Sequence, residues 1–212
     1  MVNPDRPGAQ SNAKRRPRQR EAPEVRRKLL IEATMRSIAK YGYAGTTIET
    51  ICSEAQVSRG LVNHHFGSKE ELIRQSYKAL RDEWMLQTHG SLLGSYLEPE
   101  DKLHAMIRVS FGPAMFKQEY LGIWAGFWSA IGKSPALRKL NRELFDKDRD
   151  AYQQIFEEIA GKRGKAMDAR RAALTIIALI DGFWLEWCLD PKSFTAEEAE
   201  AACLSFVAQS FA

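Results

Sequence analysis

The side chains best suited to contacting a nucleic acid lie together in one short polar stretch of this chain. Arg59, Asn63 and His64 can reach outward from a helix that is too short and too polar to serve only for packing. Arginine pairs with guanine and asparagine with adenine in a DNA major groove, and donors such as His65 and Lys69 suit the neighbouring phosphates. The stretch therefore has the chemistry of a sequence-reading DNA contact.

The elements that must hold these side chains form a predicted helix-turn-helix. Ser58 is expected to cap a recognition helix at about residues 58–65, because its hydroxyl can accept from a free backbone N–H of the first turn. The preceding segment, residues 46–55, begins with a threonine cap and places its apolar residues on one helical face. Only Gln56 and Val57 separate this segment from Ser58, which predicts a sharp corner between the two helices.

These residues resemble the tetracycline-repressor (TetR) family of one-component bacterial transcription regulators. The matching runs are Leu30-Ile31-Glu32-Ala33, Gly42-Tyr43-x-Gly45-Thr46-Thr47-Ile48, Ile51-x-x-x-Ala55-x-Val57-Ser58-x-Gly60 and His65-Phe66-x-x-Lys69-Glu70-x-Leu72. Two departures are present: Gln56 stands where the family usually has a glycine in the turn, and Asn63 replaces a common tyrosine, which can alter base preference. The predicted DNA-binding residues are Thr46, Thr47, Ser58, Arg59, Gly60, Asn63, His64, His65 and Lys69.

Basic residues are concentrated at the start of the chain, beside the predicted DNA contact. The 212 residues carry a net charge of +4, and residues 1–28 hold nine Lys or Arg against three acidic residues. Residues 1–22, rich in Pro, Gly, Asn and Arg, are predicted to be a disordered basic tail. Such a tail can be an ordinary solvated segment, but beside a helix-turn-helix we expect it to neutralise DNA phosphates.

The rest of the chain predicts an all-α protein with no strand. Helices are expected at about Glu24–Lys40, 46–55, 58–65, Lys69–Gly90, Pro99–Phe116, Tyr120–Gly132, Pro135–Ala160, Met167–Leu189 and Thr195–Phe211. Breakers or caps are expected between most of them, including Gly42 at the end of the first helix and a Thr195–Glu198 capping box at the start of the last. The expected organisation is the tail, a DNA-binding domain over residues 23–70, and a helical effector-binding and dimerisation domain over residues 71–212.

Cysteine usage and hydropathy predict a cytoplasmic protein. The three cysteines are odd in number and have no CxxC spacing, and we found neither a signal-peptide core nor a run that is long and apolar enough to span a bilayer. The adjacent residues His64 and His65 point in different directions on a helix, so they do not make a metal site. We therefore expect no cofactor, no metal and no membrane partner.

Aromatic residues gather in two of the later helices. Trp124, Phe127 and Trp128 lie in one, and Phe183 and Trp184 lie in the other beside Asp181. They can form an ordinary core and a dimer seam. They can also form a cage, because aromatic faces attract quaternary ammonium ions and a nearby carboxylate adds Coulomb attraction. On that hypothesis these six residues bind a small effector.

A narrower resemblance concerns the choline-responsive members of the same family, which control glycine-betaine synthesis. It depends on Trp124-x-x-Phe127-Trp128, Ser134-Pro135-x-Leu137-Arg138-x-Leu140, Ala178-Leu179-Ile180-Asp181-Gly182-Phe183-Trp184-Leu185, and the ending Asn63-His64-His65-Phe66. The resemblance implies choline or a similar small cation as the effector.

Three functions are open at this point. The first is a homodimeric repressor that places two recognition helices on double-stranded DNA until an effector releases it. The second is an enzyme that uses Asp181 or Glu186 as an acid or base, although no nucleophile elbow, HExxH motif or P-loop accompanies them. The third is an architectural DNA-binding protein without a ligand, which would have little use for a long aromatic-rich domain.

Overall fold

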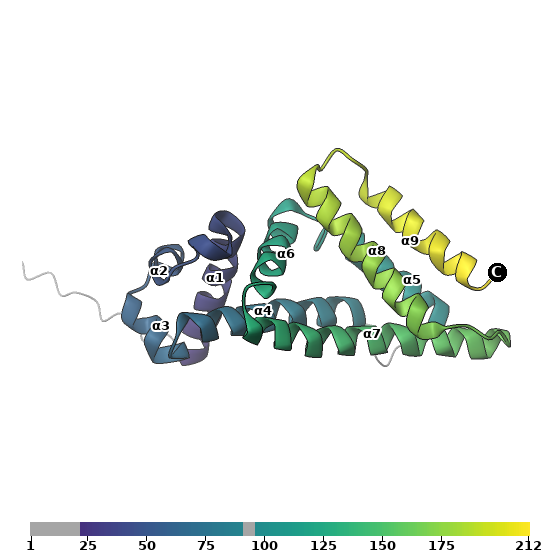
Figure 1. Cartoon of the computed structure of the whole chain (residues 1–212), viewed down its shortest axis with the longest axis horizontal. Coiled ribbons are helices and arrows are strands. Elements are labelled where there is room, and N and C mark those ends of the chain that lie inside the picture. The colour runs from purple at the N-terminus through teal and green to yellow at the C-terminus, as the bar shows by residue number, and fades with distance from the viewer. Residues whose placement is uncertain (1–21, 91–95) are drawn as a thin grey trace, which may run out of the picture.

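The computed structural model describes residues 22–90 and 96–212, and within these ranges it contains helices and no strand (Figure 1). The elements are α1 (Pro23–Gly45), α2 (Ile48–Ala55), α3 (Arg59–Phe66), α4 (Lys69–Met85), a π-helical turn η1 (Leu86–Gly90), α5 (Pro99–Phe111), α6 (Gln118–Ile131), α7 (Pro135–Arg163), α8 (Ala169–Leu189) and α9 (Ala196–Ser210). The all-α prediction is confirmed. Apart from Ala22, the predicted basic tail lies outside the described residues.

Helices α1 to α3 gather at one end of the molecule around a small apolar core (Figure 1). That core is made of Leu30, Ala33, Ile51, Cys52, Ala55, Val62, Phe66 and Leu72. Helix α2 begins with a capping box, in which the N–H of Thr50 donates to the Thr47 hydroxyl and the N–H of Thr47 donates to the Thr50 hydroxyl. Gln56 turns the corner to α3 at φ 54°, the left-handed conformation for which the family's usual glycine is suited.

Helix α4 leads from this end into the larger helical region, where α7 runs alongside it and α8 and α9 lie beyond (Figure 1). A second apolar core is formed by residues of the helices from α4 through α9, and it also includes Ile38 of α1. Helix α6 also packs directly on α1, since a Cβ atom built on Gly126 would lie 2.4 Å from Ile38 Cγ2. The small helical end is therefore held by two elements, α4 and α6.

Two helix ends depend on backbone conformation. Regular α1 geometry breaks at Gly42, with φ 68°, as the sequence predicts. Helix α5 ends at Phe111, so the expectation that it continues to Phe116 is wrong. Gly112 is extended because it precedes Pro113, which disfavours the helical region for the residue before it. Met115 then turns back into the core before α6 begins.

Within the described ranges, α8 alone has the length and composition of a membrane-spanning helix, a segment that the sequence analysis did not single out. One of its faces, formed by Ala173, Ile176, Ile177, Ile180 and Trp184, is buried in the second core. Core helices of globular proteins share this composition, and α8 is packed as one of them.

Candidate functional site

The recognition helix α3 presents its polar residues on one exposed face. Arg59, Gly60, Asn63 and His64 are all exposed, while Val62 and Phe66 on the opposite face are buried in the small core. No atom of the described residues lies within 4 Å of a Cβ built on Gly60, so this position faces away from the described part of the chain. We call these four exposed residues the reading surface.

Three hydroxyl residues beside the reading surface have different surroundings. Thr46 is fully buried and its hydroxyl donates to Gly42 O (2.8 Å), which suits a role in holding the corner. Thr47 is half-buried and caps α2. Ser58 stands at the predicted cap position of α3, but its hydroxyl makes no capping bond, because the N–H of Leu61 already donates to the Ser58 carbonyl oxygen (3.1 Å). The exposed Ser58 hydroxyl is left available.

His65 and Lys69 lie at the edge of this surface and are half-buried. Lys69 Nζ donates to Thr46 O (3.4 Å). The carbonyl oxygen of His65 accepts from Arg27 of α1, whose guanidinium also lies 4.4 Å from the Phe66 ring centroid. Desolvation, followed by the neighbouring positive charges, lowers the pKa of His65, so this ring is neutral at pH 7.

Arg59 has a partner that sequence analysis missed. Its Nη1 lies 3.1 Å from Glu49 Oε1 of α2, and both side chains are largely exposed. Hydrogen bonds from its own backbone N–H and from Thr47 lower the pKa of Glu49, with a smaller contribution from the charge of Arg59. The acid is therefore ionised at neutral pH. The ten-residue spacing between Glu49 and Arg59 gives no periodic signal, because the corner at Gln56 brings them together.

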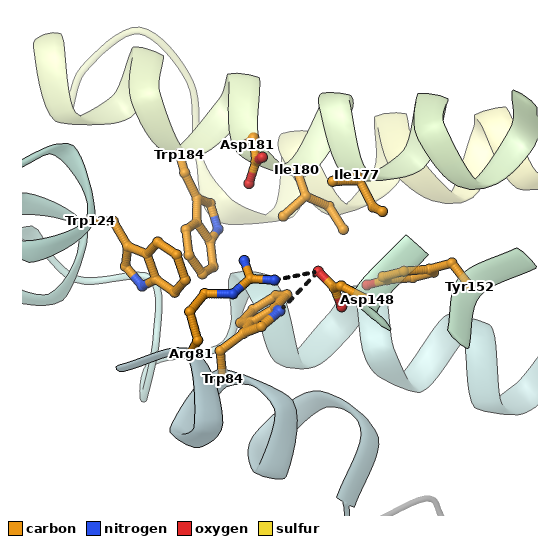
Figure 2. Close-up of a pocket in the computed structure, with 9 residues that line it drawn as sticks. All are labelled: Arg81, Trp84, Trp124, Asp148, Tyr152, Ile177, Ile180, Asp181 and Trp184. Atoms are coloured by element: carbon orange, nitrogen blue, oxygen red, sulfur yellow. Dashed lines mark hydrogen bonds and ion pairs between the residues drawn. The ribbon is translucent and has the colours of Figure 1, made fainter. Parts of the chain in front are cut away.

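A second candidate site is a cavity between α4, α6, α7 and α8 (Figure 2). Its lining residues are Arg81, Trp84, Trp124, Asp148, Tyr152, Ile177, Ile180, Asp181 and Trp184. Of the six predicted effector-binding residues, three are brought together here: Trp124, Asp181 and Trp184. The structure places Phe127, Trp128 and Phe183 outside this cavity.

The three predicted residues outside the cavity have other packing roles. Phe127 is buried against Tyr77, with ring centroids 5.1 Å apart. Trp128 is half-buried and packs on the far side of Trp124. Phe183 packs on Phe111 of α5 and on Phe194, which precedes α9. Helical spacing alone could not separate these residues from the lining ones.

Three indoles form the apolar wall of the cavity. Trp84 and Trp184 have ring centroids 5.0 Å apart, Trp124 and Trp184 are 5.7 Å apart, and all three pairs are edge to face. The Nε1 of Trp184 donates to Ser110 O (3.1 Å), which fixes this ring. The free space is about 10 Å³, close to the room that a single water requires. A larger ligand must part the indoles.

Arg81 and Asp148 are the charged centre of the cavity. Arg81 Nη2 donates to Asp148 Oδ2 (3.4 Å) and to Leu144 O (3.3 Å), and Trp84 Nε1 also donates to Asp148 Oδ2 (3.4 Å). The guanidinium carbon lies 5.5 Å from the Trp124 ring centroid. Both ionic side chains are almost completely buried. Neither residue was predicted, since they come from helices far apart in the sequence.

Two further ionisable groups face Asp148 or Arg81. His89, carried inward by η1, lies with Nε2 3.5 Å from Asp148 Oδ1, and burial lowers its pKa so that it is neutral at pH 7. Asp181 is crowded by surrounding protein, which raises its pKa to about 7 despite the nearby charge of Arg81. The residue is nevertheless exposed to solvent, so the carboxylate form remains accessible.

Comparisons with known families cover the reading surface and the part of the cavity that α6, α7 and α8 supply, while Arg81 and Trp84 lie between the two matched ranges. Residues 30–75 match the family described as bacterial regulatory proteins, tetR family, and residues 99–212 match the BetI-type transcriptional repressor C-terminal family. The chain is 33% identical over 177 residues to the HTH-type transcriptional regulator BetI of Paraburkholderia phymatum, covering 83% of this chain and 88% of that protein. It is 34% identical over 167 residues to the protein of the same name from Burkholderia lata, covering 78% and 84%.

Solved structures show the same fold. A transcriptional regulator from Pseudomonas aeruginosa PAO1 superposes with a TM-score of 0.82 at 32% identity, over 90% of this chain and 92% of that one. A transcriptional regulator from Saccharomonospora viridis, solved in complex with choline, superposes with a TM-score of 0.76 at 19% identity, over 87% and 96%.

Proposed function

Since the chain belongs to the tetR family and is a transcriptional repressor with a BetI-type C-terminal region, we propose that a small quaternary ammonium compound of the choline type releases it from DNA. Its relatives are regulators, so Asp181 and Glu186 need no catalytic role. The observation that carries the proposal is the wall of three edge-to-face indoles with Asp181 beside it. Aromatic faces and a carboxylate are what attract such a cation. The choline complex of the S. viridis regulator supports the same class of effector.

The reading surface is proposed to enter a major groove of double-stranded DNA. Arg59 and Asn63 would contact base edges, because their side chains are exposed on one face of α3. His64, Ser58 and Thr47 would contact phosphates, with His65 and Lys69 at the edge. The open space around Gly60 lets the DNA backbone approach closely.

Release would be transmitted through α4 and α6, the two elements that hold the small helical end. Trp84 and Arg81 lie on α4. Trp124 lies on α6, two residues before Gly126, where that helix contacts α1. A ligand that parts the indoles must displace one of these helices. Moving the population from almost all bound to almost all released needs about 10⁴-fold preference of the ligand for the released state.

A homodimer is proposed to form through α8 and α9. Helix α8 exposes a stripe of apolar or small residues, Leu174, Ala178, Gly182, Leu185 and Leu189, and α9 exposes Ala201, Ala202 and Ala208. Two subunits joined there would place two reading surfaces on successive major grooves, roughly 34–36 Å apart. We further propose a DNA-binding domain at residues 23–70 and an effector-binding and dimerisation domain at residues 71–212, which have largely separate apolar cores except that Leu72 joins the first core and Ile38 the second.

The dimer has a direct test. Light scattering at micromolar concentration should give twice the chain mass of 24.1 kDa, and Leu185→Glu should give a monomer. Leu86→Glu, at a leucine that is more exposed than Leu185 (66% against 44%) but lies on η1, should leave the dimer intact. A monomeric wild type would contradict the proposed interface.

The proposed release is tested with labelled DNA from upstream of the coding region, with and without millimolar choline. Sequence-preferring binding that choline weakens supports the repressor and its effector class. Binding that choline leaves unchanged removes choline as an effector, and equal binding to random DNA would favour the architectural function instead.

A further inference from the structure

The aromatic wall already faces a positive charge that belongs to the chain itself. Figure 2 shows the Arg81 side chain reaching among Trp84, Trp124 and Trp184 toward Asp148. Its guanidinium carbon lies 5.5 Å from the Trp124 ring centroid, and only 9% of the side chain is exposed. A cation entering the cavity must therefore share it with a buried arginine.

Asp181 faces the same space from α8, on the other side of the cavity (Figure 2). Among the described residues, Arg81 and Asp181 both line the cavity and form no ion pair with each other. The space between the indoles thus has the guanidinium of Arg81, paired with Asp148, on one side and the carboxyl group of Asp181 on the other.

Buried polar atoms without a protein partner gather around this cavity. Arg81 Nε, Trp124 Nε1 and the Tyr152 hydroxyl are buried and make no hydrogen bond among the described residues. The acceptor Asp148 Oδ1 also has no hydrogen bond there, but it lies 3.5 Å from His89 Nε2. Arg81 Nε and Trp124 Nε1 can only donate, and the Tyr152 hydroxyl can donate as well. Buried donors are normally satisfied, so a ligand that fits here should bring acceptor atoms.

We propose that the effector is a small zwitterion that carries both a quaternary ammonium group and a carboxylate. Its carboxylate would accept from Arg81 Nε, and its ammonium group would lie against the indoles beside Asp181. This inference depends on the proposed function and narrows it. A zwitterion leaves the net charge of the cavity unchanged, whereas a simple cation adds positive charge beside a buried guanidinium. Hydrogen bonds between ionised partners are also stronger than those to a neutral hydroxyl.

The test compares three ligands on the wild-type protein, with tryptophan fluorescence as the readout. Glycine betaine carries the carboxylate, its amide has the same shape without the negative charge, and choline carries a hydroxyl. We expect glycine betaine to bind about tenfold or more tightly than the other two. Equal or tighter binding of choline or the amide would overturn the inference.

A variant assigns the difference to Arg81. Arg81→Gln should remove the preference for glycine betaine over its amide. Arg149→Gln is the matched control, because Arg149 pairs with Asp146 and Asp150 of its own helix and does not line the cavity. If Arg81→Gln does not fold, the wild-type ligand series decides alone. If choline binds and releases DNA but glycine betaine does not bind, only the zwitterion fails; if none of the three ligands binds, the proposed effector class fails with it.

Discussion

The reading surface and the cavity each contain an arginine paired with a carboxylate, under opposite conditions. Arg59 and Glu49 are 3.1 Å apart with 70% and 53% of their side chains exposed. Arg81 and Asp148 are 3.4 Å apart with only 9% and 4% exposed. Water screens the first pair and can replace either partner, while the second pair depends on protein groups alone.

This difference suits the two proposed tasks. The exposed Arg59 can exchange Glu49 for a base or a phosphate at little cost. The buried Arg81 cannot leave Asp148 unless something else supplies a counter-group, so a ligand that does so can change the position of α4. An exposed ion pair can therefore exchange partners easily, whereas a buried ion pair suits a conformational switch.

The largest expected effect is on the buried pair. Asp148→Asn leaves the Arg81 charge without a counter-ion in the core, and the free energy of unfolding should fall by about 3–5 kcal/mol. Urea denaturation followed by far-UV circular dichroism measures this. A loss below about 1 kcal/mol would mean that the pair is as replaceable as the exposed one.

On the reading surface the expected effect is on DNA rather than on stability. Arg59→Ala should cost about 1–3 kcal/mol of binding to the specific site and relax its sequence preference. Lys69→Ala should instead weaken all sequences alike and flatten the dependence on salt. Fluorescence anisotropy with specific and random duplexes separates the two. Equal losses on both duplexes for Arg59→Ala would remove it from base reading.

The contact that joins the two regions can be strained directly. Gly126→Ala places a methyl group against Ile38 of α1, which should lower the free energy of unfolding by about 1–3 kcal/mol. Gly122→Ala, one turn earlier on α6 with open space around it, should be neutral or stabilising. Indistinguishable unfolding curves for the two variants would contradict the close α1–α6 contact.

A smaller effect concerns pH. The pKa of Asp181 is raised to about 7, so its carboxylate forms as pH rises through neutrality, and choline should bind severalfold more tightly at pH 8 than at pH 6. Burial lowers the pKa of the nearby His89, which disfavours a positive charge on that ring. Asp181→Asn should abolish the dependence.

The stability that Asp181 contributes changes with pH in the opposite direction to the affinity for choline. A raised carboxyl pKa means that the folded state holds a proton that the unfolded state releases, so the contribution of Asp181 to stability is greatest below its ordinary pKa of 3.8. It is lost as pH rises toward 7.

Loss of choline affinity with rising pH would contradict the proposed role of this carboxylate.

The smallest expected effect is at the exposed pair. Glu49→Gln should leave the unfolding curve unchanged, because water replaces the lost carboxylate. DNA binding should become slightly tighter, since a negative charge beside the phosphates is removed and Arg59 is free. Weaker DNA binding would show instead that Glu49 orients Arg59 in the complex.

The fold and the reading surface could largely be predicted because their signals are local. The corner at Gln56, the glycine break at Gly42 and the Thr195–Glu198 capping box each involve residues a few positions apart. Two local predictions, the cap at Ser58 and the end of α5, were wrong because of the backbone conformation at these sites. The Ser58 carbonyl took the N–H that its hydroxyl was expected to bind, and Pro113 ended α5 early.

The cavity could be predicted only in part because its members come from four helices. Helical spacing marked Trp124 and Trp184, but it also marked Phe127, which faces the core. Arg81 and Asp148 are 67 residues apart. Arginine and aspartate side chains are usually exposed to solvent, and nothing in the sequence around Arg81 or Asp148 indicates that these two are buried.

Thermodynamic linkage between the two regions can be measured directly. The dissociation constant of a quaternary ammonium ligand is determined by tryptophan fluorescence with and without saturating specific DNA. If ligand binding in the cavity releases the reading surface, the DNA must weaken ligand binding by the same factor by which the ligand weakens DNA binding. Equal ligand affinity in the presence and absence of DNA would show that the cavity does not control the repressor.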